Sequence, residues 1–178
     1  PDHEPGRPSF KLEHLTAANG LAHEAAHDAL SDVTATIALA KLVKEKQPRL
    51  FEYVVNNRGK KAVAEMLNLE ARKPFFHISG MLDKAHMYGA VMMPLAKQPS
   101  NNNGVICFDL SADPELLISL NVKEIQRRVF TSAAELPEDT ERIPLKVIHL
   151  NKAPIVTTPK LIDREAAERL AIDMRLCE

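Results

Sequence analysis

The chain has 178 residues, of which 45% are hydrophobic and 26% are charged, and its formal net charge at pH 7 is −1. This composition is that of an ordinary globular protein, with room for one domain or for a small domain and part of another. It excludes nucleic-acid binding through bulk basicity, so such a function would need local basic patches, and no apolar run reaches the roughly 18 residues of a membrane-spanning helix.

The first 48 residues have the pattern of helices. Residues 10–18 carry apolar side chains at helical spacing, and the Asn-Gly pair that follows is a typical helix end. Residues 28–46 are rich in Ala, Leu, Val and Ile and contain no helix breaker before Gln47-Pro48. Because apolar residues occupy most of the surface of this second helix, we expect it to be buried. Two shorter helices are expected within residues 49–70.

From Arg72 onward the sequence changes to short β-rich runs bounded by Gly, Pro and Asn. The five runs are "KPFFHISG", "YGAVMMPLA", "GVICFDL", "IPLKVIHL" and "APIVTT". Helices are expected between the third and fourth runs, capped by Asp113 and Asn121, and near the C-terminus, capped by Asp163. We therefore predict an α+β chain with helices over 1–48, followed by a small mixed β-barrel domain with flanking helices over 49–178.

The stretch "LAHEAAHDALSD", residues 21–32, contains two overlapping patterns of metal-dependent enzymes. The first is His23-Glu24-x-x-His27, the HExxH of zinc proteases, in which the two His bind Zn²⁺ and the Glu polarises water. Here the charged Asp28 follows the second His, and the Gly and His of the extended metzincin pattern are absent. A zinc metalloprotease is therefore the least favoured interpretation.

The second pattern is His27-x-Ala29-x-x-Asp32, which shares His27 with the first. Carboxylate oxygens suit Mg²⁺, and a neutral imidazole suits a base that takes a proton from water at pH 7. His27 stands just before the predicted helix and Asp32 in its first turn, so the two side chains can project to one side. This pattern predicts part of a two-metal site for phosphodiester hydrolysis.

The residues around this pattern resemble those of known nucleases. "KLEHLTAANGL" followed by "AHDALSDVTATIALAKLV" is similar to the third motif of the DEDDh (proofreading-type) exonuclease superfamily. "QPRLFEYV", "KPFFHISGM" and "VIHLNKAPIV" resemble the bacterial exodeoxyribonuclease I family, and the resemblance covers essentially the whole chain. It implies the C-terminal helices of an RNase H-like exonuclease domain, followed by an SH3-like barrel. It also implies degradation of single-stranded DNA from the 3′ end to mononucleotides, in DNA repair and recombination.

The resemblance assigns roles to two residues and shows what this sequence lacks. It implies that His27 is the general base and that Asp32 is a ligand in a site of two Mg²⁺ ions, which Mn²⁺ can replace. The family's other carboxylates, an Asp-x-Glu on a first β-strand and a further Asp, have no counterpart here. We therefore expect a fragment of a longer, monomeric enzyme that is inactive by itself. The alternative is a non-catalytic barrel that binds single-stranded DNA or an acidic peptide.

A local basic cluster is the predicted binding surface. Arg72 and Lys73 belong to it with Arg58, Lys60 and Lys61, and Tyr53 precedes them in the sequence. By resemblance, Tyr53, Lys73 and Arg72 contact single-stranded DNA or the acidic C-terminal tail of single-stranded-DNA-binding protein. The chemistry suits both ligands, because bases stack on an aromatic ring and cations neutralise phosphate or carboxylate.

The remaining candidates are expected to be structural. We expect the histidines of the β-rich part to pack or to lie on the surface, and His23 to be a surface residue. Arg127 and Arg128 are assigned to a solvated helical face. The isolated Cys107 and Cys177 suit unpaired thiols in a reducing cytoplasm.

Overall fold

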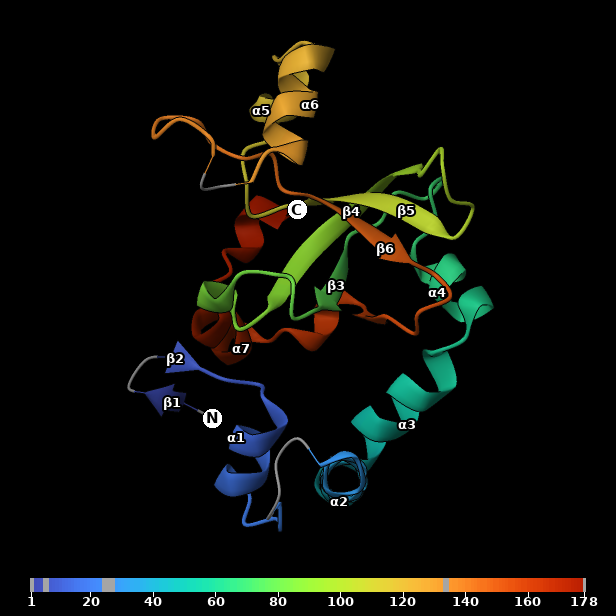
Figure 1. The fold of residues 1–178 in the computed structure, drawn as a ribbon. Helices are drawn as coiled ribbons and strands as arrows, with labels where there is room; N and C mark the ends of the chain where they lie inside the picture. Colours follow the sequence, from blue (N-terminus) through green and yellow to red (C-terminus); the bar gives the residue numbers. More distant parts are fainter. Residues whose placement is uncertain (1, 5–6, 24–27, 133–134, 178) are drawn as a thin grey trace. The chain divides into compact units, whose positions relative to one another are not determined.

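The chain forms two compact units, Pro1–Arg58 and Gly59–Glu178 (Figure 1). The computed structural model describes residues 2–4, 7–23, 28–132 and 135–177. The division falls after helix α3 (Pro48–Asn57), which packs on α2 of the first unit. The domain limit at residue 48 that the composition suggested lies before this helix.

The first unit is built from three helices and a short strand pair. Strands β1 (Asp2–Glu4) and β2 (Arg7–Pro8) are antiparallel, and helices α1 (Leu12–Ala18) and α2 (Ala29–Lys46) precede α3. The predicted limits of the second helix are confirmed: Asp28 caps its N-terminus by accepting a hydrogen bond from the Ser31 N–H at 3.0 Å. It ends at Gln47, and Pro48 starts α3 because proline is favoured in a first helical turn.

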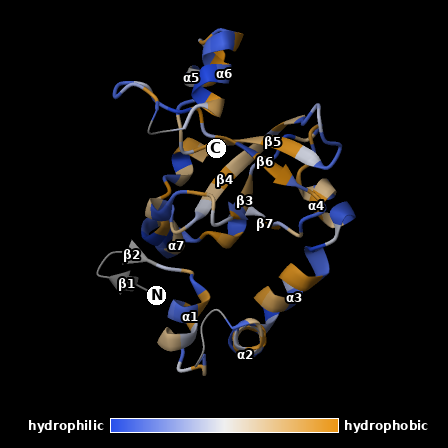
Figure 2. Ribbon diagram, viewed as in Figure 1, coloured by the Kyte–Doolittle hydropathy of each residue, from blue (hydrophilic) through white to orange (hydrophobic). Residues whose placement is uncertain are grey.

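Helix α2 is largely exposed within the part of the chain that the structure describes, although its apolar composition suits a helix that another surface buries. Ala35 is its one buried residue, whereas the side chains of Leu30, Val33 and Ile37 are 75%, 55% and 50% exposed. These three positions recur at helical spacing, and they therefore mark one apolar stripe. Apolar residues are also visible along α3 in Figure 2.

The second unit contains a curled, antiparallel five-stranded sheet, which confirms the predicted barrel-like β-structure (Figure 1). All five predicted β-rich runs form strands. In the sheet their order is β6-β5-β4-β3-β7. Their bounds are β3 (Phe75–Ile78), β4 (Gly89–Lys97), β5 (Gly104–Asp109), β6 (Leu145–His149) and β7 (Ile155–Thr157).

Short helices connect and flank the strands, as expected for an α+β unit. Asn121 and Asp163 cap their helices as predicted, accepting backbone N–H bonds at 3.0 and 2.8 Å. Asp113 accepts the Glu115 N–H at 2.9 Å. The α-helices are α4 (Lys60–Met66), α5 (Glu115–Ile118), α6 (Val122–Phe130) and α7 (Arg164–Leu170). The 3₁₀ turns are η1 (Lys84–His86), η2 (Pro159–Leu161) and η3 (Met174–Cys177).

Both faces of the sheet are covered, because successive residues of a strand point to opposite sides. Phe75 belongs to a core with Met92, Cys107 and residues of α4, whereas Phe76 belongs to a second cluster with residues near α7 and η3. Both cysteines are buried free thiols, and burial raises the pKa of Cys107 to about 12. None of the helices that the structure describes combines the length and apolar character needed to cross a bilayer.

Candidate active site and binding surface

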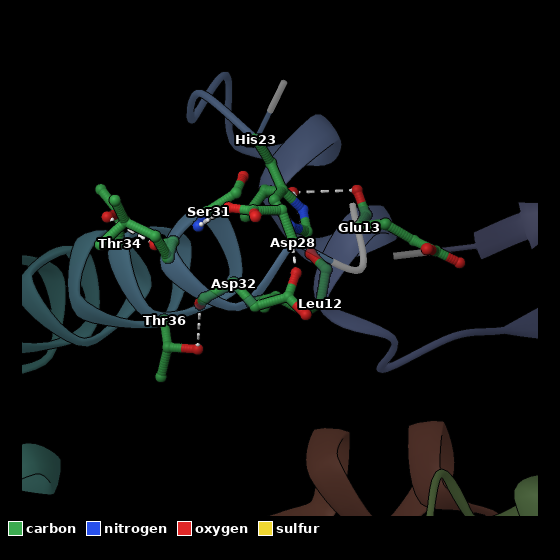
Figure 3. Close-up of polar contacts among 10 residues, drawn as sticks. Leu12, Glu13, His23, Asp28, Ser31, Asp32, Thr34 and Thr36 are labelled. Carbon is green, nitrogen blue, oxygen red and sulfur yellow. Dashed lines mark hydrogen bonds and ion pairs between the residues drawn. The ribbon is translucent and has the colours of Figure 1, made fainter. Parts of the chain in front are cut away.

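Asp32 lies in the first turn of α2, where its position is fixed by the helix start (Figure 3). Its side chain is 42% exposed. The carboxylate oxygen Oδ1 accepts a hydrogen bond from His23 Nε2 at 2.8 Å. Four residues earlier, Asp28 uses its own carboxylate to cap the helix. The two carboxylates at the start of α2 therefore differ in role: Asp28 stabilises the helix end as its N-cap, and Asp32 is held by a side chain from outside the helix.

His23 is not the surface residue that the sequence analysis expected. Its side chain is only 6% exposed, and its ring lies between Asp32 of α2 and Thr16 of α1. The expectation was wrong because the partner is nine positions away and the contact depends on how α1 packs on α2. Local pattern does not reveal such a contact.

The zinc interpretation does not agree with the position of His23. A zinc-bound imidazole offers the metal a nitrogen lone pair, whereas His23 Nε2 lies 2.8 Å from Asp32 Oδ1, an oxygen that accepts a hydrogen bond. Glu24 and His27, the other residues of that pattern, lie outside the described residues. The role of His27 as a general base therefore stays a prediction.

The described residues offer one oxygen ligand for Mg²⁺ and do not complete a metal site. Carboxylate oxygen is the ligand type that Mg²⁺ prefers, and Asp32 is exposed enough for a cation to reach it. Within the described ranges, no group of three or more His, Cys, Asp or Glu side chains is arranged to hold a metal ion. Asp32 thus fits as one member of a ligand set that the described residues do not complete.

The predicted binding residues are distributed over both units. Tyr53 is half-buried in α3. Arg72 and Lys73 are exposed in the segment between α4 and β3. A turn presents them: the Asn68 side chain accepts the Glu70 and Ala71 N–H groups at 2.8 and 3.0 Å. Because Tyr53 and the two cations belong to different units, their shared surface stays a prediction.

Two histidines of the second unit, His77 and His86, have structural contacts. His77 is buried, and its Nδ1 lies 2.8 Å from the carbonyl oxygen of Ile155. Burial lowers the pKa of His77, and the nearby charge of Lys146 lowers it further. Nδ1 of His86 lies 3.0 Å from the carbonyl oxygen of Leu170. Both contacts agree with the expected packing role.

A pocket with a volume of about 970 Å³ lies in the second unit, beside β6 and the end of β3. Its basic lining residues are Arg142, Lys146 and Lys152, and its acidic ones include Asp83 and Asp109. Burial lowers the pKa of Lys146. None of the ion pairs found in the described part of the chain includes Lys146. The pocket therefore presents a partly buried cation to any anion that enters it.

The sequence analysis did not identify Lys146 or His23 as site residues. Only for Lys146 does the sequence contain a pattern that could have indicated such a role. Within "LKVIH", strand alternation places Lys146 on the same side as Ile148, which is buried in the core. A lysine on the inward side of a strand is a candidate for a role in a cavity. His23 had no comparable signal, because its contact with Asp32 depends on how α1 packs on α2.

Comparison with protein families identifies the second unit. The family described as "Exonuclease I SH3-like domain" matches residues 58–178. The exodeoxyribonuclease I of Haemophilus influenzae is 45% identical over 173 residues, which are 97% of this chain and 37% of the relative. That of Escherichia coli is 41% identical over 177 residues, which are 99% of this chain and 37% of the relative. The chain therefore spans a little over a third of the length of these relatives.

Solved structures give the same correspondence. E. coli exonuclease I in complex with a dA16 oligonucleotide has a TM-score of 0.93 and 41% identity, over 99% of this chain and 38% of that one. An ExoI/SSB-Ct complex has a TM-score of 0.89 and 39% identity, over 99% and 37% of the two chains. A zinc-ion-bound E. coli ExoI–ssDNA complex has a TM-score of 0.91 and 41% identity, over 96% and 36%.

Proposed function

Because this chain belongs to the exonuclease I family and carries its SH3-like domain over residues 58–178, we propose that it is part of a Mg²⁺-dependent exodeoxyribonuclease. The proposed enzyme degrades single-stranded DNA from the 3′ end to mononucleotides, in DNA repair and recombination in the cytoplasm. The similarity to exodeoxyribonucleases I extends through the first unit, which contains the His27-x-Ala29-x-x-Asp32 motif.

The observation that carries this proposal is the geometry of Asp32. Its carboxylate stands in the first turn of α2, is 42% exposed and is oriented by a 2.8 Å hydrogen bond from His23. An oriented and accessible carboxylate on a regular helix is suited to ligate a cation that must sit at a fixed distance from a phosphate. A carboxylate with a structural role alone would be expected to cap a helix end, as Asp28 does.

Each residue of the motif has a proposed part in the reaction. Asp32 binds the metal through a carboxylate oxygen, and His27 accepts the proton of the attacking water. When bound, the metal stabilises the negative charge that develops on the phosphate oxygens. Mg²⁺ is the expected ion, because the proposed ligands are carboxylates, and Mn²⁺ shares this preference.

We propose that the chain by itself is inactive. Asp32 is one carboxylate, and the described residues contain no group of three or more His, Cys, Asp or Glu side chains that could hold a metal ion. The remaining carboxylates would come from the parts of the relatives that this chain does not match, which make up about 63% of the H. influenzae protein, given that 37% is matched. The whole enzyme is proposed to act as a monomer.

Tyr53, Arg72 and Lys73 are proposed to bind single-stranded DNA or the acidic C-terminal tail of single-stranded-DNA-binding protein. The exposure of Arg72 and Lys73 supports this role, because a cation in water can neutralise phosphate or carboxylate without first breaking a buried contact. The similarity to an ExoI/SSB-Ct complex and to ExoI bound to oligonucleotides supports the choice of partners.

A second function is favoured by the pocket of the second unit. Lys146 stands partly buried in it, with Arg142 and Lys152 also on its lining. A chain without a complete metal site would then act as a binding barrel for single-stranded DNA or an acidic peptide. The two functions differ in one respect: the nuclease needs Asp32, whereas the barrel alone does not.

The test is the degradation of a 5′-labelled single-stranded oligonucleotide in the presence of Mg²⁺. The full-length protein should produce a ladder of products shortened from the 3′ end, and EDTA should abolish it. The isolated chain should bind the oligonucleotide without shortening it. A ladder from the isolated chain would refute the proposed dependence on carboxylates outside it, and an uncut oligonucleotide with the full-length protein would refute the nuclease.

A further inference from the structure

His23 connects the two helices of the candidate site. It lies in the segment between α1 and α2, and its side chain is 6% exposed although its partner Asp32 is 42% exposed. Figure 3 shows the ring between the start of α2 and α1. The pair therefore has a buried donor and an accessible acceptor.

The proton on the ring is placed by the chemistry of its partner. A carboxylate accepts hydrogen bonds and donates none, so Nε2 carries the hydrogen that points at Asp32 Oδ1, 2.8 Å away. Such a bond to an ionised acceptor is stronger and more directional than one between neutral groups. It limits the rotation of the Asp32 carboxylate about its last side-chain bond, which is otherwise a broad torsion.

The other side of the ring rests on a rigid part of α1. Nδ1 lies 3.4 Å from Thr16 Oγ1, and Thr16 is 1% exposed. The Thr16 hydroxyl is itself held, because it can donate to the carbonyl oxygens of Leu12 and Glu13 at 2.9 and 3.0 Å. The orientation of His23 is therefore set by α1, and it passes that orientation to a side chain of α2.

We infer that His23 is a positioning residue of the nuclease site, holding the Asp32 carboxylate in the orientation in which it binds the metal ion. This inference rests on the proposed function, in which Asp32 is a metal ligand. Hydrogen bonds to ligating carboxylates orient them and support metal affinity, and their loss commonly weakens that affinity about 10- to 100-fold. His23 does not contact the metal in this arrangement; it acts through Asp32.

The test measures binding of Mn²⁺ alone to the full-length protein by titration calorimetry, without DNA. Two variants remove the hydrogen-bond donor: His23→Phe, which keeps the buried volume, and His23→Ala. The variant that keeps the thermal unfolding midpoint of the wild type is used. His23→Gln retains an N–H that can reach the carboxylate. Asn19→Ala is the matched control, because it removes a 2.8 Å hydrogen bond at the C-terminal end of α1, to the Leu15 carbonyl, that involves neither His23 nor Asp32.

The expected result is a Mn²⁺ affinity at least about tenfold weaker in the folded donor-less variant. His23→Gln should recover much of this loss, and Asn19→Ala should bind Mn²⁺ as the wild type does. An affinity within twofold of the wild type in the donor-less variant would overturn the inference. The inference would also be overturned if His23→Gln bound Mn²⁺ no better than His23→Phe or His23→Ala, or if Asn19→Ala lost as much affinity as they do. Each of these results would indicate a general effect of packing. If neither His23→Phe nor His23→Ala folds, His23→Gln is compared with Asn19→Ala instead. Wild-type Mn²⁺ affinity in both of these variants supports the positioning role, and a weaker affinity in His23→Gln overturns it.

Asp32→Asn separates this inference from the proposed function. If Asp32→Asn and the donor-less His23 variant both lose Mn²⁺ affinity, both proposals stand. If only Asp32→Asn loses it, Asp32 is a ligand but His23 does not position it. If Asp32→Asn binds Mn²⁺ like the wild type, the proposed metal-binding role of Asp32 fails, and the role of His23 fails with it.

Discussion

At the scale of single residues, burial decides the chemistry of His77. Its ring is 4% exposed and contacts the Ile155 carbonyl at 2.8 Å. Burial lowers its pKa below the ordinary 6.5, and the positive charge of Lys146 adds to this effect. The folded protein therefore resists protonating His77 at a pH where the unfolded chain protonates it.

The sign of the resulting pH dependence follows from that difference. Between the ordinary pKa of about 6.5 and the lower pKa of the folded state, the unfolded state binds more protons at this position than the folded state, so the free energy of unfolding falls as the pH falls. We predict that urea unfolding of the chain shows a lower midpoint at pH 5 than at pH 7.5, and that His77→Gln reduces this difference. An equal loss of stability in the variant would show that other groups cause it.

The position of Asp32 in the fold could be predicted from sequence, but its hydrogen bond from His23 could not. Its place in the first turn of a helix follows from the long apolar run that begins after Asp28. The hydrogen bond from His23 depends on the packing of α1 against α2. Sequence spacing alone gave His23 two other readings, a zinc ligand and a surface residue. Its burial contradicts the second, and its nitrogen Nε2 faces the Asp32 carboxylate.

At the scale of elements, Gly89 shows how closely strand β4 approaches its neighbours. A β-carbon at Gly89 would lie 2.7 Å from Cζ and 2.9 Å from Cε2 of Phe76, whose ring is buried on the second face of the sheet. A ring in a packed core moves only with its neighbours. The absence of a side chain at position 89 is therefore part of the packing of this face.

We predict that Gly89→Ala lowers the free energy of unfolding by about 1–3 kcal/mol, the usual cost of overpacking a core. The measurement is urea unfolding followed by circular dichroism. Gly80→Ala is the matched control, because no atom lies within 4 Å of a β-carbon there, and it should change stability by less than about 0.5 kcal/mol. Equal effects of the two substitutions would contradict the packing explanation.

Helices and strands were predictable where local signals agree. Asn121 and Asp163 mark helix starts through their own side chains, and the five β-rich runs all become strands. The burial of α2 was not predictable from its composition. Its stripe of Leu30, Val33 and Ile37 is exposed in this chain, because burial depends on which surfaces are available to cover the helix.

At the scale of the whole molecule, the exposed cations of the second unit fall into two kinds. Arg72 and Lys73 are exposed beside a turn. Arg127 instead donates to Glu124 at 3.1 and 2.6 Å, and with Arg128 it lowers the pKa of Glu124 to about 2. The expected solvated face of α6 is therefore an ion-paired one. This difference provides a charge-matched control for the binding surface.

We predict that Lys73→Ala weakens binding of a labelled acidic peptide, with the sequence of the single-stranded-DNA-binding protein tail, by about tenfold in the full-length protein. A charge-assisted hydrogen bond contributes about 1.5 kcal/mol, which corresponds to that factor. Fluorescence anisotropy over a salt series measures the affinity for the peptide, and the affinity of the wild type should fall as the salt concentration rises. Arg127→Ala should bind like the wild type. Equal weakening in both variants would mean that net charge, and not this surface, attracts the peptide.

The metal site is the feature that this chain could not define alone. The similarity to exodeoxyribonucleases I spans 97% of the chain but 37% of the H. influenzae relative. The sequence supplied the motif, and the structure adds the orientation of its aspartate. The remaining ligands are proposed to lie in the parts of the relatives that this chain does not match, so they follow from the family and not from any contact among the described residues.

The measurement that tests the central claim most directly compares two aspartates at the start of α2 in the full-length protein. The rate of 3′ shortening of a 5′-labelled single-stranded oligonucleotide is measured with Mg²⁺ for the wild type, Asp32→Asn and Asp28→Asn. Asp28→Asn should retain a rate within a few-fold of the wild type, because Asn caps a helix about as well as Asp. Asp32→Asn should be slower by at least about 100-fold, because it replaces a proposed metal ligand. An Asp32→Asn rate close to that of the wild type would contradict the assignment of this carboxylate to the nuclease site.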